Sequence, residues 1–182
     1  MASVYSLNIF KENNLQLNWH DVYWGLKEGI ISLGEVEEYA EKHIDKDISN
    51  EIIQSIVFDK SSRNEILDKL GELVGRYIAE NERKQRYEFS KRKWRYCILQ
   101  CLANSNLDFS SMFDHIEQIY ALFGYPEDML SFIPYMPPQD NYKPTLHTDM
   151  ENRNRLFNNL SVFLNTEKNF FKDNLTQYSA IF

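Results

Sequence analysis

Helix-start signals recur along this chain, and they constrain its fold more than any other feature. Three times a residue that favours helix caps is followed three positions later by an acid: Asn18 with Asp21, Ser32 with Glu35, and Ser62 with Glu65. In such a capping box each side chain satisfies a backbone N–H that the helix leaves without a partner. Apolar side chains then follow at spacings of three and four, which is typical of one buried helix face. The pattern predicts an all-α chain.

The same signals predict about eight or nine helices in a single compact domain spanning residues 1–182. The predicted helices lie near residues 18–29, 32–43, 49–58, 62–78, 87–103, 109–123 and 126–134 and from 149 onwards, with a ninth starting at Thr166. Whether the helix near 87 continues directly from the one before it is left open, because Glu80–Lys93 contains neither Gly nor Pro. Loose alternation over 3–10 and 15–17 also leaves open a short N-terminal β-hairpin.

Composition and charge exclude several classes of protein. The chain has 182 residues, a net charge of -7 and 43% apolar residues, which rules out general disorder. Its average surface repels nucleic acid and anionic membranes. No apolar run approaches the roughly 20 residues that cross a bilayer. The N-terminus also lacks a basic leader followed by an apolar stretch, so we expect a cytoplasmic protein.

The charges are unevenly distributed, because a basic segment lies within an acidic chain. Residues 83–95 carry a net charge of +6, which leaves -13 for the remainder. The cationic side chains are Arg83, Lys84, Arg86, Lys91, Arg92, Lys93 and Arg95. They predict, as an alternative function, the binding of RNA or DNA phosphates. Two other interpretations are open: a solvated helix face paired with the chain's own acids, or an acidic remainder that docks a basic protein.

A row of acids follows the second predicted helix. Its members are Glu37, Glu38, Glu41 and Asp45. They face away from the apolar side that contains Val36 and Ala40, so they form a negative stripe. Carboxylates need burial or a cleft before they serve in acid–base chemistry. We therefore interpret the stripe either as a solvated face or as a surface that attracts a basic partner.

Residues that carry chemistry elsewhere do not form a recognisable site here. Cys97 and Cys101 lie four apart on one predicted helix face, and a structural zinc site would need further ligands, so we interpret both as buried apolar residues. His147, Asp149 and Glu151 are interpreted as the start of a helix rather than as metal ligands. No phosphate loop or nucleophile signature occurs. We predict no catalytic residue, cofactor or metal, and an enzyme with an unrecognised site is kept as an alternative.

The segment Ile119–Pro138, IYALFGYPEDMLSFIPYMPP, is the most distinctive string in the chain. Gly124 is predicted to end one helix, Pro126 to occupy the first position of the next, and Pro134 to end it. The loop that follows carries three candidate contact residues: Tyr135, Met136 and Tyr142. Aromatic side chains of this kind anchor protein interfaces. The alternative is that they fold back onto the core.

Three stretches of the chain resemble one family of small bacterial proteins that is catalogued as a domain of unknown function. They are LNWHDVYWGLKEGIISLGEVEEYAEKHI, IYALFGYPEDMLSFIPYMPP and ENRNRLFNNL, about a third of the sequence. The resemblance implies an all-helical domain, and it brings no established activity and no catalytic residues. Small acidic bacterial proteins of this kind are often found as immunity partners of secreted toxins, which is an association rather than a property of the fold.

These observations favour a non-enzymatic cytoplasmic binding protein. The leading hypothesis is an immunity protein that neutralises a basic toxin, a nuclease for example, by stoichiometric binding. Nucleases are basic because they bind phosphates, and an acidic inhibitor gains association rate from that charge. The expected contact residues are the acidic stripe and the three residues of the proline-rich loop. The sequence leaves the oligomeric state open.

Overall fold

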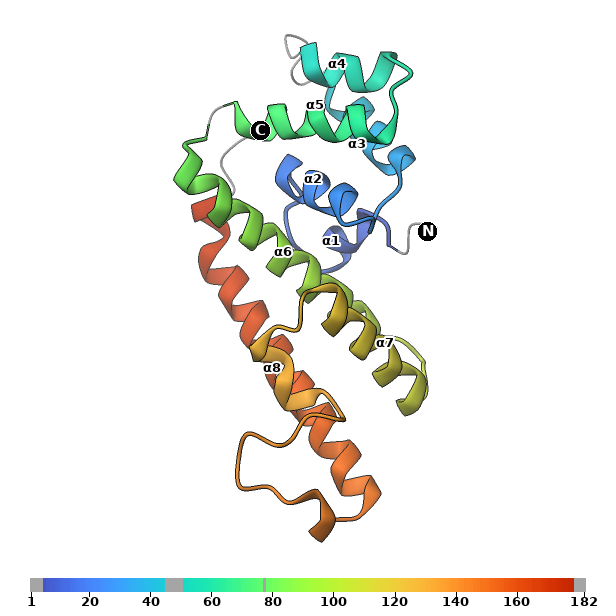
Figure 1. Ribbon diagram of the computed structural model, residues 1–182, viewed down its shortest axis with the longest axis vertical. Coiled ribbons are helices and arrows are strands. Elements are labelled where there is room, and N and C mark those ends of the chain that lie inside the picture. Colours follow the sequence, from blue (N-terminus) through green and yellow to red (C-terminus); the bar gives the residue numbers. More distant parts are fainter. Residues whose placement is uncertain (1–4, 45–50, 77, 179–182) are drawn as a thin grey trace. The chain divides into compact units, whose positions relative to one another are not determined.

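The computed structural model describes residues 5–44, 51–76 and 78–178, and in these ranges the chain forms helices joined by turns and loops (Figure 1). Its described residues form eight α-helices and two short 3-10 helices, and they contain no β-strand. The elements are α1 (Asn8–Glu12), α2 (Trp19–Lys27), α3 (Leu33–Ile44), α4 (Glu51–Phe58), α5 (Arg63–Gly75), α6 (Glu80–Ala103), α7 (Phe109–Leu122), η1 (Glu127–Phe132), η2 (Pro144–Leu146) and α8 (Asp149–Tyr178). The predicted all-α class is confirmed.

Two of the three predicted capping boxes are complete. At the start of α2, the Asn18 side chain accepts from the Asp21 N–H at 3.2 Å, and the Asp21 carboxylate accepts from the Asn18 N–H at 3.0 Å. Ser62 and Glu65 exchange the same pair of bonds at the start of α5. These helices begin where their sequences place the caps. The two backbone N–H groups at each start have no acceptor inside the helix, and the capping side chains supply one.

The third box is only half formed, and in the described residues a short helix, α1, stands where the sequence leaves open an N-terminal β-hairpin. The Glu35 N–H donates to Ser32 Oγ at 3.3 Å, but the Glu35 carboxylate accepts from the backbone N–H of Leu7 at 2.9 Å. Leu7 is the N-cap of the short helix α1, which has no side-chain cap of its own. Ile9 and Phe10 are adjacent and both buried, an arrangement that a strand with one buried face does not allow. Residues 3 and 4 lie outside the described residues.

Several predicted helix boundaries are corrected. α6 begins at Glu80 rather than near 87, and it is separate from α5, which ends at Gly75. Pro126 occupies the cap position before η1 rather than its first residue. α8 runs without a break from Asp149, so the ninth helix does not exist as a separate element. Thr166 does not cap a new helix, because its hydroxyl donates to the Val162 carbonyl within α8 at 2.9 Å.

Backbone proximity divides the chain into two compact units, with the boundary inside α6. The first contains the residues up to Trp94 and the last part of the chain from Gln177, and the second is Arg95–Thr176. The predicted single domain stays a prediction.

The core of the first unit is built around Trp94, which is fully buried. Its ring meets Phe10 edge-on, with centroids 4.7 Å apart, and its indole N–H donates to the Asp21 carbonyl at 2.8 Å. The same ring lies against Gly25, where a Cβ atom would come within 2.7 Å of it. The first half of α6 thus shares one core with α1 and α2.

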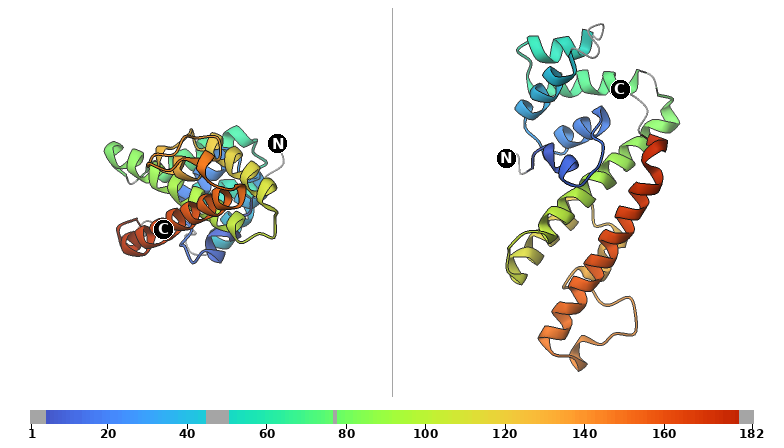
Figure 2. Two further views of the ribbon diagram at one scale, coloured as in Figure 1. Left: turned by 90° about the horizontal axis from the view of Figure 1, so that it is seen from below. Right: turned by 180° about the vertical axis from the view of Figure 1, so that it is seen from behind.

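Aromatic contacts along α8, the long helix drawn in orange to red in Figure 2, hold the second unit together. Ring pairs join α8 to α6, α7 and η1 in turn: Tyr96–Phe171, Phe113–Phe157 and Phe132–Phe163. Gly124 ends α7 as predicted, with a positive φ of 79° that glycine adopts without strain. The segment after α7 is thereby turned back toward α8.

Candidate protein-binding surfaces

The acidic stripe lies on the exposed side of α3. Glu37, Glu38 and Glu41 are exposed, while Val36 and Ala40 on the opposite side are fully buried. Asp45, the fourth predicted member, lies outside the described residues. Glu38 forms an ion pair with Lys42 at 2.5 Å, and among the described residues Glu37 and Glu41 take part in no ion pair. Two carboxylates are therefore available to an external cation.

A cavity of about 590 Å³ borders this stripe, lined by α1, residues 14–17 and α3. Glu38 and Lys42 belong to its lining and bring charges of both signs. Glu35, which also lines it, is occupied by its bonds to the Leu7 N–H and to the Ser6 hydroxyl. This carboxylate anchors α1 against α3.

The proline-rich loop of the second unit presents its three predicted contact residues differently. Tyr135 is 56% exposed, whereas Met136 and Tyr142 are half-buried. The Tyr142 hydroxyl donates to the Asn152 side chain at 2.7 Å, and the Arg155 guanidinium lies over the Tyr142 ring. Tyr142 is therefore folded back onto α8, and of the three only Tyr135 projects freely.

Sequence reasoning missed Tyr125, which is 61% exposed and follows Gly124 at the end of α7. Its φ is 57°, in the left-handed region that a bulky residue rarely adopts, and its ring meets Tyr120 edge-on. Such backbone strain persists where the surroundings impose it, and it is concentrated at functional sites. The sequence signal that could have identified Tyr125 is its position between a helix-ending glycine and Pro126.

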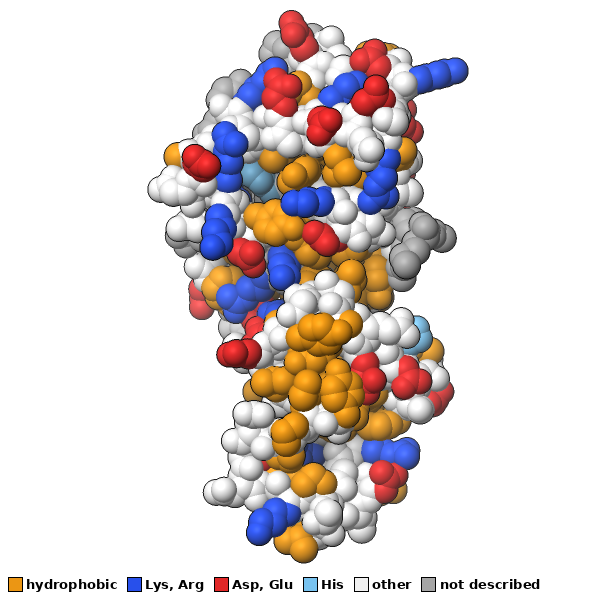
Figure 3. All heavy atoms as spheres, in the orientation of Figure 1, with side chains coloured by type: hydrophobic (Ala, Val, Ile, Leu, Met, Phe, Trp, Pro, Cys, Tyr) orange, Lys and Arg blue, Asp and Glu red, His pale blue; other side chains and the backbone are white. Residues whose placement is uncertain are grey.

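Both exposed tyrosines belong to the second unit, one on each side of η1. Desolvation raises the pKa of Tyr135, and the charges of Glu117, Tyr120 and Tyr125 raise it further. Figure 3 shows apolar side chains gathered on one face of the second unit. We call Tyr125 and Tyr135 the tyrosine pair. Exposed tyrosine rings are suited to contact both apolar and cationic groups of a protein.

The basic segment 83–95 is not a continuous exposed face. Lys93 and Arg95 are buried. Lys93 Nζ donates to Asp21 at 2.5 Å and to the Gln16 carbonyl at 2.6 Å. Arg95 forms a two-bond pair with Asp128 at 2.9 and 2.5 Å. These two cations are therefore already neutralised by acids of their own unit.

The remaining cations of the segment are partly engaged as well. Arg83 is exposed and donates to the carbonyls of Gly75 at 3.0 Å and Ile78 at 3.4 Å. Lys84 is exposed, and Arg86, Lys91 and Arg92 are half-buried. A nucleic acid would therefore meet fewer free cations than the sequence suggests.

A comparison with protein families identifies the chain. The model of one bacterial family matches residues 7–168, which includes most of both units. The chain belongs to the family described as "Uncharacterized protein conserved in bacteria (DUF2247)". The DUF2247 match confirms the resemblance to an uncharacterised bacterial family, and it covers α3 and the tyrosine pair. No curated protein and no solved structure is significantly similar to the chain.

The chemistry-bearing residues of this DUF2247 member are dispersed. Cys97 is buried and Cys101 is exposed, and the described residues contain no group of three or more His, Cys, Asp or Glu that could hold a metal ion. Glu151 forms a capping box with Thr148 at the start of α8, which accounts for its place beside His147. Of the helices in the described ranges, none has the length and apolarity required to cross a bilayer.

Proposed function

We propose that this chain is a cytoplasmic, non-enzymatic immunity protein that neutralises a basic nuclease toxin by forming a one-to-one complex. The observation that carries the proposal is the tyrosine pair, two large exposed rings of the second unit, of which Tyr125 has a strained backbone. Tyrosine is enriched among the residues that contribute most to binding energy at protein interfaces. A turn fixed by Gly124 and Pro126 presents the Tyr125 ring at little cost in conformational entropy.

The charge of the chain supports a basic partner. The net charge is -7, so acids outnumber bases over the chain, and Lys93 and Arg95 are already paired with acids of their own units. Glu37 and Glu41 would gain partners in the complex without breaking an ion pair among the described residues. Acidic surfaces raise the association rate with a basic protein and disfavour acidic competitors. Inhibition then requires only that the bound protein cover the toxin's substrate cleft.

The proposal predicts that a gene next to this one encodes a basic toxin domain, and that domain is the probe of the function. We expect cells that produce this domain to survive only when they also produce the chain, and the purified chain to abolish nuclease activity at one equivalent. Loss of toxicity through chemical change of the toxin, seen as turnover at substoichiometric amounts of the chain, would contradict stoichiometric inhibition. So would survival that does not depend on the chain.

The acidic stripe is tested by charge reversal. The triple variant Glu37→Lys, Glu38→Lys, Glu41→Lys is expected to slow association with the toxin domain at low salt by about tenfold or more, because electrostatic steering contributes that much to the rate. The matched control reverses three exposed acids elsewhere in the first unit, Glu12→Lys, Asp68→Lys and Glu88→Lys, with the same change in net charge. Equal slowing in both triple variants would mean that net charge causes the effect. That result would contradict the proposal that the stripe is part of the interface.

A further inference from the structure

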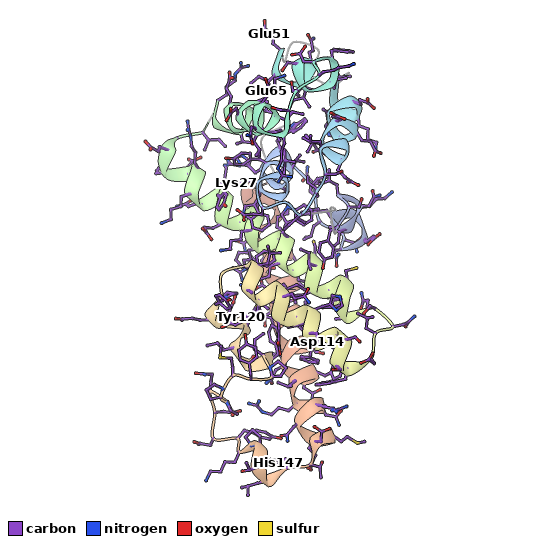
Figure 4. All side chains as sticks on the ribbon, turned by 45° about the vertical axis from the view of Figure 1, so that its right-hand side comes forward. Lys27, Glu51, Glu65, Asp114, Tyr120 and His147 are labelled. Atoms are coloured by element: carbon purple, nitrogen blue, oxygen red, sulfur yellow. The ribbon has the colours of Figure 1, made fainter. Side chains whose placement is uncertain are left out.

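A second cavity in the first unit lies between α2, α5 and α6 and has a volume of about 450 Å³. Pockets for small molecules usually measure about 300–1,000 Å³. Figure 3 shows the hollow on the face of these helices, with a histidine inside it and Lys and Arg side chains around it. In Figure 4 the labelled Lys27 projects from α2 in this region. The cavity is large enough for a ligand of metabolite size.

The lining of this cavity is positive although the chain is acidic. Lys27, Arg83 and Lys84 line it, and none of its lining residues is an Asp or Glu. The Lys27 ammonium lies 4.8 Å from the centre of the Tyr87 ring, and Lys84 is exposed; neither lysine is in an ion pair within the described residues. A concave site lined by one sign of charge concentrates ligands of the opposite sign.

The guanidinium of Arg83 is held in place at the edge of the cavity. Its bonds to the carbonyls of Gly75 and Ile78 use one face of the side chain and fix its position near the end of α5. Arginine and lysine are the side chains that bind phosphate groups, the first through paired N–H donors and the second as a point charge. The cavity therefore carries the cations that a phosphate group requires.

Two glycines of α5 keep the cavity open. Gly71 and Gly75 both line it and lie one helical turn apart, although glycine destabilises the interior of a helix. A Cβ atom on Gly71 would lie 3.8 Å from the ring of Tyr23, an ordinary contact, so packing does not require glycine there. Because glycine has no side chain, space is left in front of Tyr23 and Tyr87, whose rings also line the cavity.

His20 adds a neutral polar group to the lining. Burial, followed by the nearby charge of Arg86, lowers the pKa of His20 to about 4, so its imidazole is uncharged at neutral pH. A neutral imidazole offers one hydrogen-bond donor and one acceptor. The cavity thus combines cations, aromatic rings and a neutral polar group around one space.

We propose that this cavity binds a small phosphate ester that carries a planar ring, of the size of a nucleoside monophosphate. The phosphate pairs with Arg83, Lys84 and Lys27, and the ring lies against the tyrosines. Bases stack on aromatic side chains in this way without a strict sequence preference. The proposal goes beyond inhibition of a toxin, and its test needs the chain alone.

The ligand class is tested by titration calorimetry of the full chain with AMP, GMP, CMP and UMP. Ribose 5-phosphate lacks the ring, and adenosine lacks the phosphate. We expect at least one nucleotide to bind with a dissociation constant below about 1 mM and at least about tenfold more tightly than either fragment, because each contact adds binding free energy. The absence of binding by all four nucleotides at about 5 mM would overturn the proposal. Equal binding of a fragment and the best nucleotide would overturn it as well.

The location is tested with two lysines that are both exposed and both outside any ion pair among the described residues. Lys84→Glu is expected to weaken binding of the best nucleotide by about tenfold or more, and Lys60→Glu by less than about twofold. Gly71→Leu fills the cavity and should abolish binding, with circular dichroism as the check that it folds. Equal weakening of nucleotide binding by both lysine variants would overturn the proposed location of the site. That result does not depend on whether Gly71→Leu folds.

Discussion

His20 shows how the burial of a single residue makes stability depend on pH. In the folded chain its pKa is lowered from 6.5 to about 4, chiefly by burial and then by Arg86, whereas in the unfolded chain it takes up a proton near pH 6.5. The unfolded state therefore binds more protons between these two values, so stability falls as the pH drops from 7 to 5. The expected contribution is about 2 kcal/mol at pH 5.

Denaturant unfolding of the wild type and of His20→Gln at pH 7 and pH 5 measures this contribution. The variant lacks the titrating group and should lose less stability on acidification than the wild type. An equal loss in both proteins would mean that other groups cause the pH dependence.

Two helical glycines differ in what their surroundings allow. A Cβ atom at position 25 would lie 2.7 Å from the Trp94 ring, and one at position 71 would find ordinary contacts. Gly25→Ala is therefore expected to destabilise the chain by about 1–3 kcal/mol through overpacking. Gly71→Ala should stabilise it by about 0.5–1 kcal/mol, because alanine favours a helix. Thermal unfolding of both variants checks the opposite signs, and a loss of stability in Gly71→Ala would contradict the description of the cavity.

The sequence alone predicts some residues of the candidate surfaces and not others. The exposure of Glu37, Glu38 and Glu41 follows from helical periodicity, because Val36 and Ala40 define the buried side. The burial of Lys93 does not, because its partner Asp21 lies 72 positions earlier. Local patterns cannot show which distant acid meets a given cation.

At the scale of elements, Asp21 joins α2 to α6. Its carboxylate accepts from the Asn18 N–H, completing the cap, and from the buried Lys93 ammonium. Asp21→Asn keeps a capping side chain but leaves Lys93 charged and unpaired in the interior. We expect the free energy of unfolding to fall by about 3–5 kcal/mol.

Asp108→Asn is the matched control for Asp21→Asn. Asp108 is the N-cap of α7, is exposed and accepts from the Ser111 N–H, without an ion pair in the described structure. Asparagine and aspartate cap helices about equally well, so this variant should lose less than about 0.5 kcal/mol. Similar losses in both variants, measured by urea unfolding, would contradict a stabilising role for the buried ion pair.

Helix starts could be predicted from the sequence where a side chain caps the helix locally, and not elsewhere. Asn18 and Ser62 mark starts because their side chains bond locally. The start of α6 at Glu80 has no such signal, and Thr166 resembles a cap although it lies inside α8. Whether a helix continues past a polar stretch depends on how its apolar side packs in the folded chain. Local helix propensity carries no information about that packing.

At the scale of the whole molecule, the distribution of charge links the structure to the proposed function. The acids outnumber the bases by seven, and two of the cations in the basic segment are consumed by buried or half-buried ion pairs. Each of these pairs also uses an acid, so the rest of the chain keeps the net charge of -7, while residues 83–95 present fewer free cations than their spacing suggests. The sequence predicted an acidic binding protein, but it did not identify Tyr125 as an exposed ring.

The most direct measurement is a calorimetric titration of the basic toxin domain that the proposal expects from a neighbouring gene, with the wild type and with the double variant Tyr125→Ala, Tyr135→Ala. The proposal predicts a one-to-one complex with the wild type and about 30-fold or greater weakening in the double variant, because interface hot spots contribute about 2 kcal/mol or more. Phe58→Ala, which removes an exposed ring of the first unit, should bind like the wild type. No complex with the wild type, or equal affinity of the double variant and the wild type, would contradict the central claim.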